Sequence, residues 1–176
     1  MNNSGPTKRM RTAVARTATA TLIIALLIFW AWAFLLYEPP GNPDRLEDRN
    51  WTTAAEQLCA LAVSSINNLP AAIESPSPKH RADVIDRATL LLNKMVENLG
   101  ALTGGTDRDL DLIDKWLDDW SIYLNDRSNY AHRLRTEGDV RPYLTALPSG
   151  AGSYVDRMNG FARVNDIQSC LDPGDI

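Results

Sequence analysis

The 176-residue sequence contains few of the residues from which metal and catalytic sites are built. It has only two histidines and two cysteines. Neither His80 nor His132 has a histidine or cysteine at metal-ligand spacing, so no metal ion or other cofactor is expected. No GxSxG, HExxH, Walker-type or dinucleotide-binding motif occurs. The sequence therefore predicts that the protein is not an enzyme, although a motif search leaves open a nucleophile and a base that only folding brings together.

Charged residues are also missing from residues 17–37, which are rich in leucine, isoleucine and aromatic side chains. As a helix, this segment would span about 31 Å, close to the thickness of the hydrocarbon core of a bilayer. We therefore expect a single transmembrane signal-anchor helix. A cleaved signal peptide is the alternative, because Ala31-Trp32-Ala33 has the small-x-small pattern of a cleavage site. The length of the segment and its apolar continuation over residues 34–37 favour the anchor.

Basic and acidic residues lie on opposite sides of this segment. Four basic residues precede it and four acidic residues follow it: Lys8, Arg9, Arg11 and Arg16, then Glu38, Asp44, Glu47 and Asp48. The positive-inside rule then makes residues 1–16 a cytoplasmic tail and the C-terminal domain extracytoplasmic, in the plasma membrane. Without those four basic residues, 14 basic side chains remain against 22 acidic ones, a net charge of −8. Such a surface repels nucleic acid, so the expected partners are the lipid bilayer and a protein of the membrane or envelope.

The two cysteines, Cys59 and Cys170, lie far apart in the sequence and outside the predicted span. In an extracytoplasmic domain this favours a disulfide over two free thiols. The bond would close a loop of about 110 residues, which the chain-entropy model values at about 4–5 kcal/mol. It would hold the C-terminal tail against the first helix of the domain.

Residues 38–49 are expected to form a proline-rich stalk, and residues 50–176 the extracytoplasmic domain. Apolar residues in that domain recur at three- and four-residue spacing, and no segment shows the alternation of a strand. Helices are expected over residues 50–67, 77–99 and 107–137, and from Ser153 onward. The expected fold class is all-α: one transmembrane helix followed by a compact antiparallel bundle of about four helices.

Capping residues predict where these helices begin. Ser77 with Pro78, Thr106 with Asp109, and Ser153 with Asp156 have the spacing of helix starts. The first helix of the domain has two possible starts, at Asp48 or at Thr53 with Glu56 three residues later.

The longest predicted helix contains the run "KWLDDWSIYLNDRSNYAHRL" from Lys115 to Leu134. A helical-wheel projection of this helix separates a packing face from an acidic face, which includes Asp118, Asp126 and His132. Most carboxylates are therefore expected to point to water. Three aromatic residues, Trp116, Tyr123 and Tyr130, recur every seven residues along the flank of the packing face. We interpret them as core residues, or as an interaction surface if the fourth helix is too short to cover them.

Arg127 is a charged residue within the packing face itself. Its side chain could run along the groove with the guanidinium at the rim, or form a buried ion pair with a carboxylate from another helix. Four candidates for that carboxylate are Asp83, Asp86, Asp156 and Asp166. A third possibility is a site for an anionic ligand at the guanidinium.

Three stretches near the C-terminus, "WLDDWSIYLNDRSNYAHRL", "FARVND" and "SCLDPGD", occur in an order that resembles uncharacterised single-pass membrane-anchored proteins of high-GC Gram-positive bacteria. The resemblance covers roughly the last seventy residues. It implies a bacterial plasma-membrane setting and assigns no functional residue.

The expected function is that of a non-catalytic, membrane-anchored helical domain outside the cytoplasm. Such a domain would be a scaffold, accessory or regulatory subunit of a membrane or cell-envelope complex. A binding module for a small envelope ligand near Arg127 is the first alternative. An envelope hydrolase is the second, and it would require two carboxylates that converge in a cleft.

Overall fold

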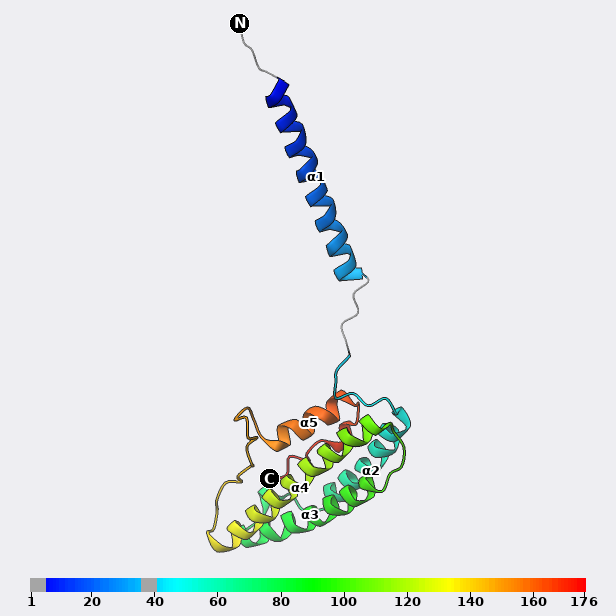
Figure 1. The fold of residues 1–176 in the computed structure, drawn as a ribbon. Helices are drawn as coiled ribbons and strands as arrows, with labels where there is room; N and C mark the ends of the chain where they lie inside the picture. Colours follow the sequence, from blue (N-terminus) through cyan, green and yellow to red (C-terminus); the bar gives the residue numbers. More distant parts are fainter. Residues whose placement is uncertain (1–5, 36–40) are drawn as a thin grey trace. The chain divides into compact units, whose positions relative to one another are not determined.

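The computed structural model describes residues 6–35 and 41–176, which belong to two compact units, Met1–Gly41 and Asn42–Ile176 (Figure 1). The described part of the first unit is one helix, α1 (Pro6–Leu35). Within it, Ala18–Leu35 is long and apolar enough to cross a membrane, and none of this stretch is buried. The helix starts within the predicted basic tail, at a proline, the residue favoured at a first helical position. Residues 1–5 of that tail, the last two residues of the predicted span and residues 38–40 of the stalk lie outside the described residues.

The second unit contains α2 (Arg49–Asn67), a short 3-10 helix η1 (Ala72–Glu74) and α3 (Pro78–Gly100). Of the two possible starts for the first helix, the chain uses Asp48, whose carboxylate accepts hydrogen bonds from the backbone N–H groups of Asn50 and Trp51. Ser77 caps α3 as expected, with Pro78 in the first turn.

The unit continues with α4 (Asp107–Thr136), α5 (Tyr154–Val164) and a second 3-10 helix, η2 (Gln168–Cys170). Both predicted capping boxes are present, at Thr106 with Asp109 and at Ser153 with Asp156. Over the described residues there is no β-strand, only an isolated bridge between Ala146 and Ser153. The all-helical prediction is therefore confirmed.

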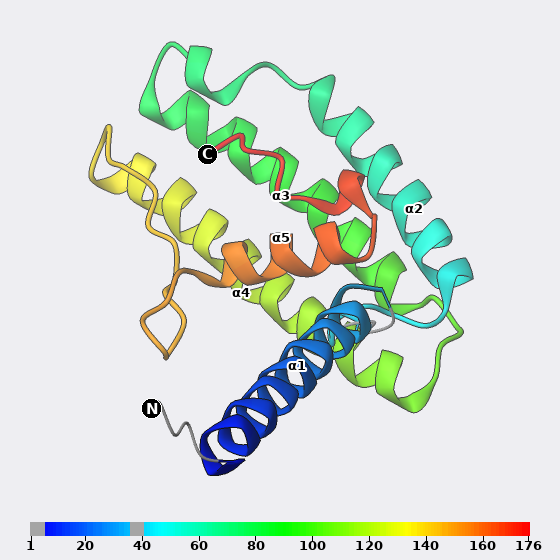
Figure 2. The same ribbon diagram turned by 90° about the horizontal axis from the view of Figure 1, so that it is seen from above.

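The long helices α3 and α4 form an antiparallel hairpin, with α2 packed on α3 and α5 packed on α4. Because α5 has only 11 residues, it covers only part of α4. Figure 2 shows η2 and the C-terminal tail, in red, between α2 and α5. An irregular segment of chain thus closes the side of the domain where a regular bundle would place a long fourth helix.

Trp116 is at the centre of the main core and joins three helices. Its ring meets that of Trp51 on α2 edge-on at 6.2 Å between centroids, and stacks on Phe161 of α5 at 5.1 Å. Its indole N–H donates to the carbonyl of Met158 at 3.1 Å, so the buried polar atom is satisfied.

The aromatic flank of α4 is part of this interior. Trp116 and Tyr123 are each 1% exposed and Tyr130 is 5% exposed. The interpretation of these three residues as an interaction surface is therefore wrong for this structure, and the interpretation as core residues is correct. The physical reason is that α5 and the C-terminal tail together cover the side of α4 that α5 alone would leave open.

Cys59 of α2 and Cys170 of η2 form the expected disulfide, with Cα atoms 5.1 Å apart. Both cysteines are fully buried. The bond fixes the start of the C-terminal tail against α2, across 111 residues of sequence.

Candidate functional site

Arg127 lies in the interior of the second unit with 0% of its surface exposed. Its Nε donates to the hydroxyl of Thr89 at 3.0 Å, and Nη1 donates to the hydroxyl of Tyr123 at 3.1 Å. Nη1 and Nη2 also donate to the two carboxylate oxygens of Asp175, at 2.5 and 2.7 Å. The guanidinium thus makes a two-pronged ion pair, the geometry in which arginine binds a carboxylate most specifically.

The partner of Arg127 is therefore a carboxylate of the C-terminal tail, and none of the four carboxylates named from the sequence. Those four are engaged elsewhere: Asp83 and Asp86 with Arg135, Asp156 with the N-terminus of α5, and Asp166 with Arg45 and Arg49. The rim position proposed for the guanidinium is also wrong, because the tail covers it. Burial alone would lower the pKa of Arg127, but Asp175 and the Tyr123 hydroxyl raise it, so the group stays charged.

The tail reaches Arg127 because a second aspartate fixes its path. Asp172 accepts hydrogen bonds from the hydroxyl of Tyr123 at 3.3 Å and the amide of Asn159 at 3.0 Å. Its own backbone N–H donates to the side-chain oxygen of Asn159 at 2.9 Å. Burial raises the pKa of Tyr123, so its hydroxyl remains protonated and can donate to Asp172 while it accepts from Arg127.

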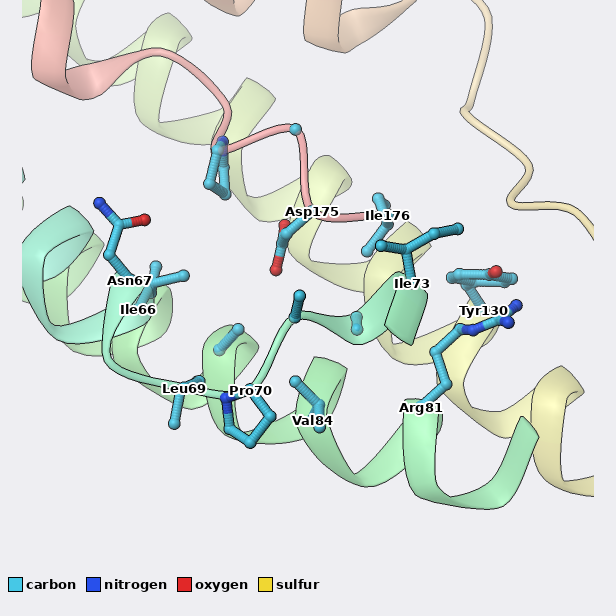
Figure 3. Close-up of a pocket in the computed structure, with 15 residues that line it drawn as sticks. Ile66, Asn67, Leu69, Pro70, Ile73, Arg81, Val84, Tyr130, Asp175 and Ile176 are labelled. Carbon is cyan, nitrogen blue, oxygen red and sulfur yellow. The ribbon is translucent and has the colours of Figure 1, made fainter. Parts of the chain in front are cut away.

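Next to this ion pair lies a cleft of about 500 Å³. Its walls come from the end of α2, the segment through η1, the first half of α3, Tyr130 of α4 and the C-terminal tail. Figure 3 shows Ile66 and Leu69 at one end of the cleft, Arg81 with Tyr130 at the other, and Asp175 between them. We call it the tail cleft. Its volume is within the range of about 300–1,000 Å³ that is typical of small-molecule sites.

Arg81 gives the tail cleft one cationic end. Its Nη1 pairs with the exposed carboxylate of Asp139 at 2.7 Å, while its Nε is buried and has no hydrogen-bond partner. An unpaired buried N–H group is unusual in a folded protein. The opposite end combines the aliphatic side chains of Ile66 and Leu69 with the amide of Asn67.

Three carboxylates of α4 are buried, and each holds a different loop or helix. Asp119 accepts two hydrogen bonds from Arg157 of α5, at 2.8 and 2.5 Å. Asp126 accepts from the backbone N–H and the hydroxyl of Thr145, both at 2.7 Å. The sequence placed Asp126 on the solvated face, which is wrong: the irregular segment after α4 folds back and buries it.

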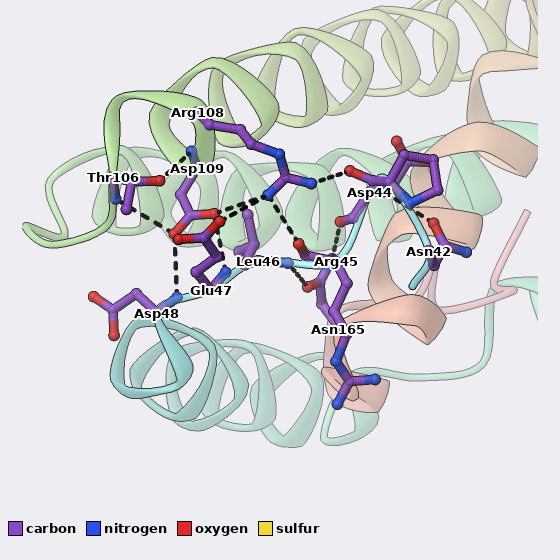
Figure 4. Close-up of polar contacts among 11 residues, drawn as sticks. Asn42, Asp44, Arg45, Leu46, Glu47, Asp48, Thr106, Arg108, Asp109 and Asn165 are labelled. Atoms are coloured by element: carbon purple, nitrogen blue, oxygen red, sulfur yellow. Dashed lines mark hydrogen bonds and ion pairs between the residues drawn. The ribbon is translucent and has the colours of Figure 1, made fainter. Parts of the chain in front are cut away.

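The third buried carboxylate, Asp109, fixes the segment that leads into the domain (Figure 4). Its oxygens accept from the backbone N–H groups of Glu47 at 3.0 Å, Asp48 at 3.1 Å and Thr106 at 3.4 Å. Burial raises the pKa of a carboxyl group, but these three donors outweigh it and lower the pKa of Asp109 below its ordinary value. The ionised form is therefore part of the native structure.

The same lead-in segment is bonded at two further points, by Arg108 and Asn165. Arg108 donates to the backbone carbonyls of Pro43 and Arg45. Asn165, at the end of α5, accepts from the N–H of Leu46 at 2.8 Å and donates to the carbonyl of Asp44 at 2.9 Å. Residues 42–48, expected as part of the proline-rich stalk, are thus packed onto the domain, with Leu46 in its core. We call this arrangement the lead-in clamp.

Both histidines are exposed, and over residues 6–35 and 41–176 no group of three or more His, Cys, Asp or Glu side chains is placed to hold a metal ion. No protein-family model matches the chain, and no curated protein or solved structure is similar enough to match it.

Proposed function

We propose that the protein is a membrane-anchored extracytoplasmic helical domain that acts as a scaffold, accessory or regulatory subunit of a membrane or cell-envelope complex. The observation that carries the proposal is the apolar stretch Ala18–Leu35, none of which is buried by the rest of the chain. An uncovered apolar helix of this length needs a bilayer or a partner around it. The four basic residues before it favour a cytoplasmic N-terminus.

The disulfide supports placement of the domain outside the cytoplasm. Disulfides persist in oxidising compartments and are rare where thiols are kept reduced. The bond between Cys59 and Cys170 is buried and closes most of the domain. A disulfide in this domain agrees with the cytoplasmic N-terminus that the four basic residues before the apolar stretch favour.

The lead-in clamp supports a role in presenting a surface. A domain on a free linker samples all orientations, whereas the bonds of Asp109, Arg108 and Asn165 hold the chain to the domain from Asn42 onward. The chain just before α2 is therefore an ordered part of the domain surface that a partner would meet.

The use of the buried carboxylates supports a non-catalytic role. Hydrolysis by a carboxylate pair requires two groups that share one substrate. Asp109, Asp119 and Asp126 point to three different segments of chain and accept hydrogen bonds from them. They do not converge on one site, and their interactions account for a role in folding.

In vivo photo-cross-linking from the full-length protein tests the proposal. The probe is placed at three exposed positions on different elements: Leu61 on α2, Leu90 on α3 and Tyr143 in the segment after α4. We expect at least one position to give a specific adduct with a membrane or envelope protein, with the other positions and unirradiated cells as controls. Full-length protein that elutes alone after mild extraction and gives no specific adduct from any position would refute it.

A further inference from the structure

The tail cleft has two chemically different ends. At one end lie Ile66 and Leu69 with the amide of Asn67, and Val84 continues the aliphatic wall toward the other end. Ile73 is 80% exposed. At the other end Arg81 lies beside Tyr130 (Figure 3). Protein interiors are packed closely enough that a cavity of about 500 Å³ is not a packing defect. A ligand that fits both ends is apolar over most of its length and carries its charge at one terminus.

The charge that the cleft favours is negative. Among the residues that the structure describes, Arg81 is the one basic residue that lines the cleft, and its buried Nε has no hydrogen-bond partner. The Arg81 side chain is 18% exposed, whereas that of its partner Asp139 is 71% exposed, so an anionic ligand competes with a carboxylate that water can solvate when it is displaced.

Asp175 does not oppose an anion in this cleft, because its charge is matched by Arg127. Two hydrogen bonds join the Asp175 carboxylate to the Arg127 guanidinium. At the cleft wall, the negative charge of Asp175 is therefore balanced by the positive charge of Arg127. The same pair holds Pro173, Gly174 and Ile176 in place as the remaining part of that wall. The ion pair thus completes the cleft, and a ligand need not reach the buried guanidinium.

We propose that the tail cleft binds the acyl chain of an anionic single-chain amphiphile, with its head group at Arg81 and its chain along Ile66, Leu69 and Val84. Such molecules are present in the membrane beside which the proposed anchor would hold the domain. The head group is a carboxylate or a phosphate, supplied by a free fatty acid or by a lysophospholipid. This binding goes beyond the scaffold role, since it requires no protein partner.

The test uses the full-length protein in nanodiscs of phosphatidylcholine with one of two diazirine-bearing probes, palmitic acid or lysophosphatidylglycerol. After irradiation, mass spectrometry locates the adducts. Adducts over residues 18–35 are expected from any lipid probe and serve as the internal standard. The proposal predicts additional adducts within residues 66–73 and 81–88, and the probe that gives them identifies the source of the ligand. Adducts confined to residues 18–35 with both probes would overturn it.

Two pairs of variants make the result specific. Val84→Trp fills the cleft and should reduce the domain adducts at least tenfold, whereas Leu90→Trp, on the exposed side of the same helix, should not. Ile73→Glu places a carboxylate at the rim without disturbing the core and should also reduce them. Leu61→Glu, at an exposed leucine of α2 away from the cleft, is its matched control. Equal labelling of Ile73→Glu and Leu61→Glu would contradict the proposal even if Val84→Trp failed to fold.

Arg81→Gln tests the assigned head-group contact. It should weaken capture of the anionic probe several-fold and leave capture of a diazirine-bearing hexadecanol unchanged, because the neutral probe gains nothing from the charge. Equal losses for both probes would show that Arg81 shapes the cleft without recognising an anion.

Discussion

Arg127 of α4 and Asp175 of the C-terminal tail form a two-pronged ion pair across 48 residues of sequence, inside the domain. The arginine is completely buried, whereas the side chain of Asp175 is 20% exposed. The pair therefore joins the C-terminal tail to the centre of the packing face of α4.

Removing one partner of this pair should destabilise the domain more than removing both. Asp175→Ala leaves a buried guanidinium without a counter-charge, for which about 3 kcal/mol of lost stability is expected. Combining it with Arg127→Met should recover part of that loss. Thermal unfolding of the full-length protein in detergent, followed by circular dichroism, measures both. Asp118→Ala, at an exposed position of α4, is the control and should change little.

Loss of the disulfide should weaken the domain through its unfolded state. Replacing both Cys59 and Cys170 by serine opens a loop defined by 111 residues of separation. The chain-entropy model gives a loss of about 4–5 kcal/mol. A thiol assay on the denatured wild-type protein should find no free thiol before reduction and two afterwards. A thiol count that reduction leaves unchanged would show that the bond does not form in cells.

The lead-in clamp should make stability depend on acid pH. Since the folded pKa of Asp109 is lowered from an unfolded value of about 3.9, its ionised form stabilises the fold fully above about pH 5. This contribution is lost as the pH falls through the folded pKa. Asp109→Asn should therefore lower stability by about 1–3 kcal/mol at pH 7. Its difference from the wild type should shrink as the solution is acidified below pH 4, and Asp111→Asn should show no such change.

Asp126 should control the irregular segment between α4 and α5. Asp126→Ala removes both hydrogen bonds to Thr145, so we expect faster amide exchange in that segment. The exchange rate should rise about tenfold for each 1.4 kcal/mol by which the local opening free energy falls. Hydrogen exchange with mass spectrometry measures the effect locally. The neighbouring exposed Asn125→Ala should leave exchange unchanged. Equal exchange in the two variants would mean that the bonds to Asp126 do not hold the segment.

The helix starts could be predicted from the sequence because their causes are local. A capping residue acts on backbone groups two or three positions away, so Ser77, Thr106 and Ser153 each mark a helix that begins at the next residue. The period of the apolar residues similarly predicted which face of α4 packs. It also identified Arg127 as a charge on that face.

The partners of the buried charges could not be predicted, because they come from irregular segments. Asp175 reaches Arg127 only through the path set by Cys170 and Asp172, and Thr145 reaches Asp126 only because the chain folds back after α4. No periodic pattern encodes either path. The same holds for Tyr123 and Tyr130, whose burial depends on the tail. Asp175 would have been among the candidate partners of Arg127 only if acidic residues of the C-terminal tail had been considered together with those on the helices.

The lead-in clamp also decides where a mechanical load enters the domain. A pull on the chain from its N-terminal side reaches the hydrogen bonds of Asn165 and Asp109 before it reaches the first turn of α2. These bonds connect the pulled segment to the end of α5 and the start of α4. Tension is therefore shared between two helices and does not act first on the end of α2. Behind them, the covalent bond from Cys59 to Cys170 limits how far α2 can be drawn away. The domain is thus built to keep its shape when the segment that leads into it is pulled.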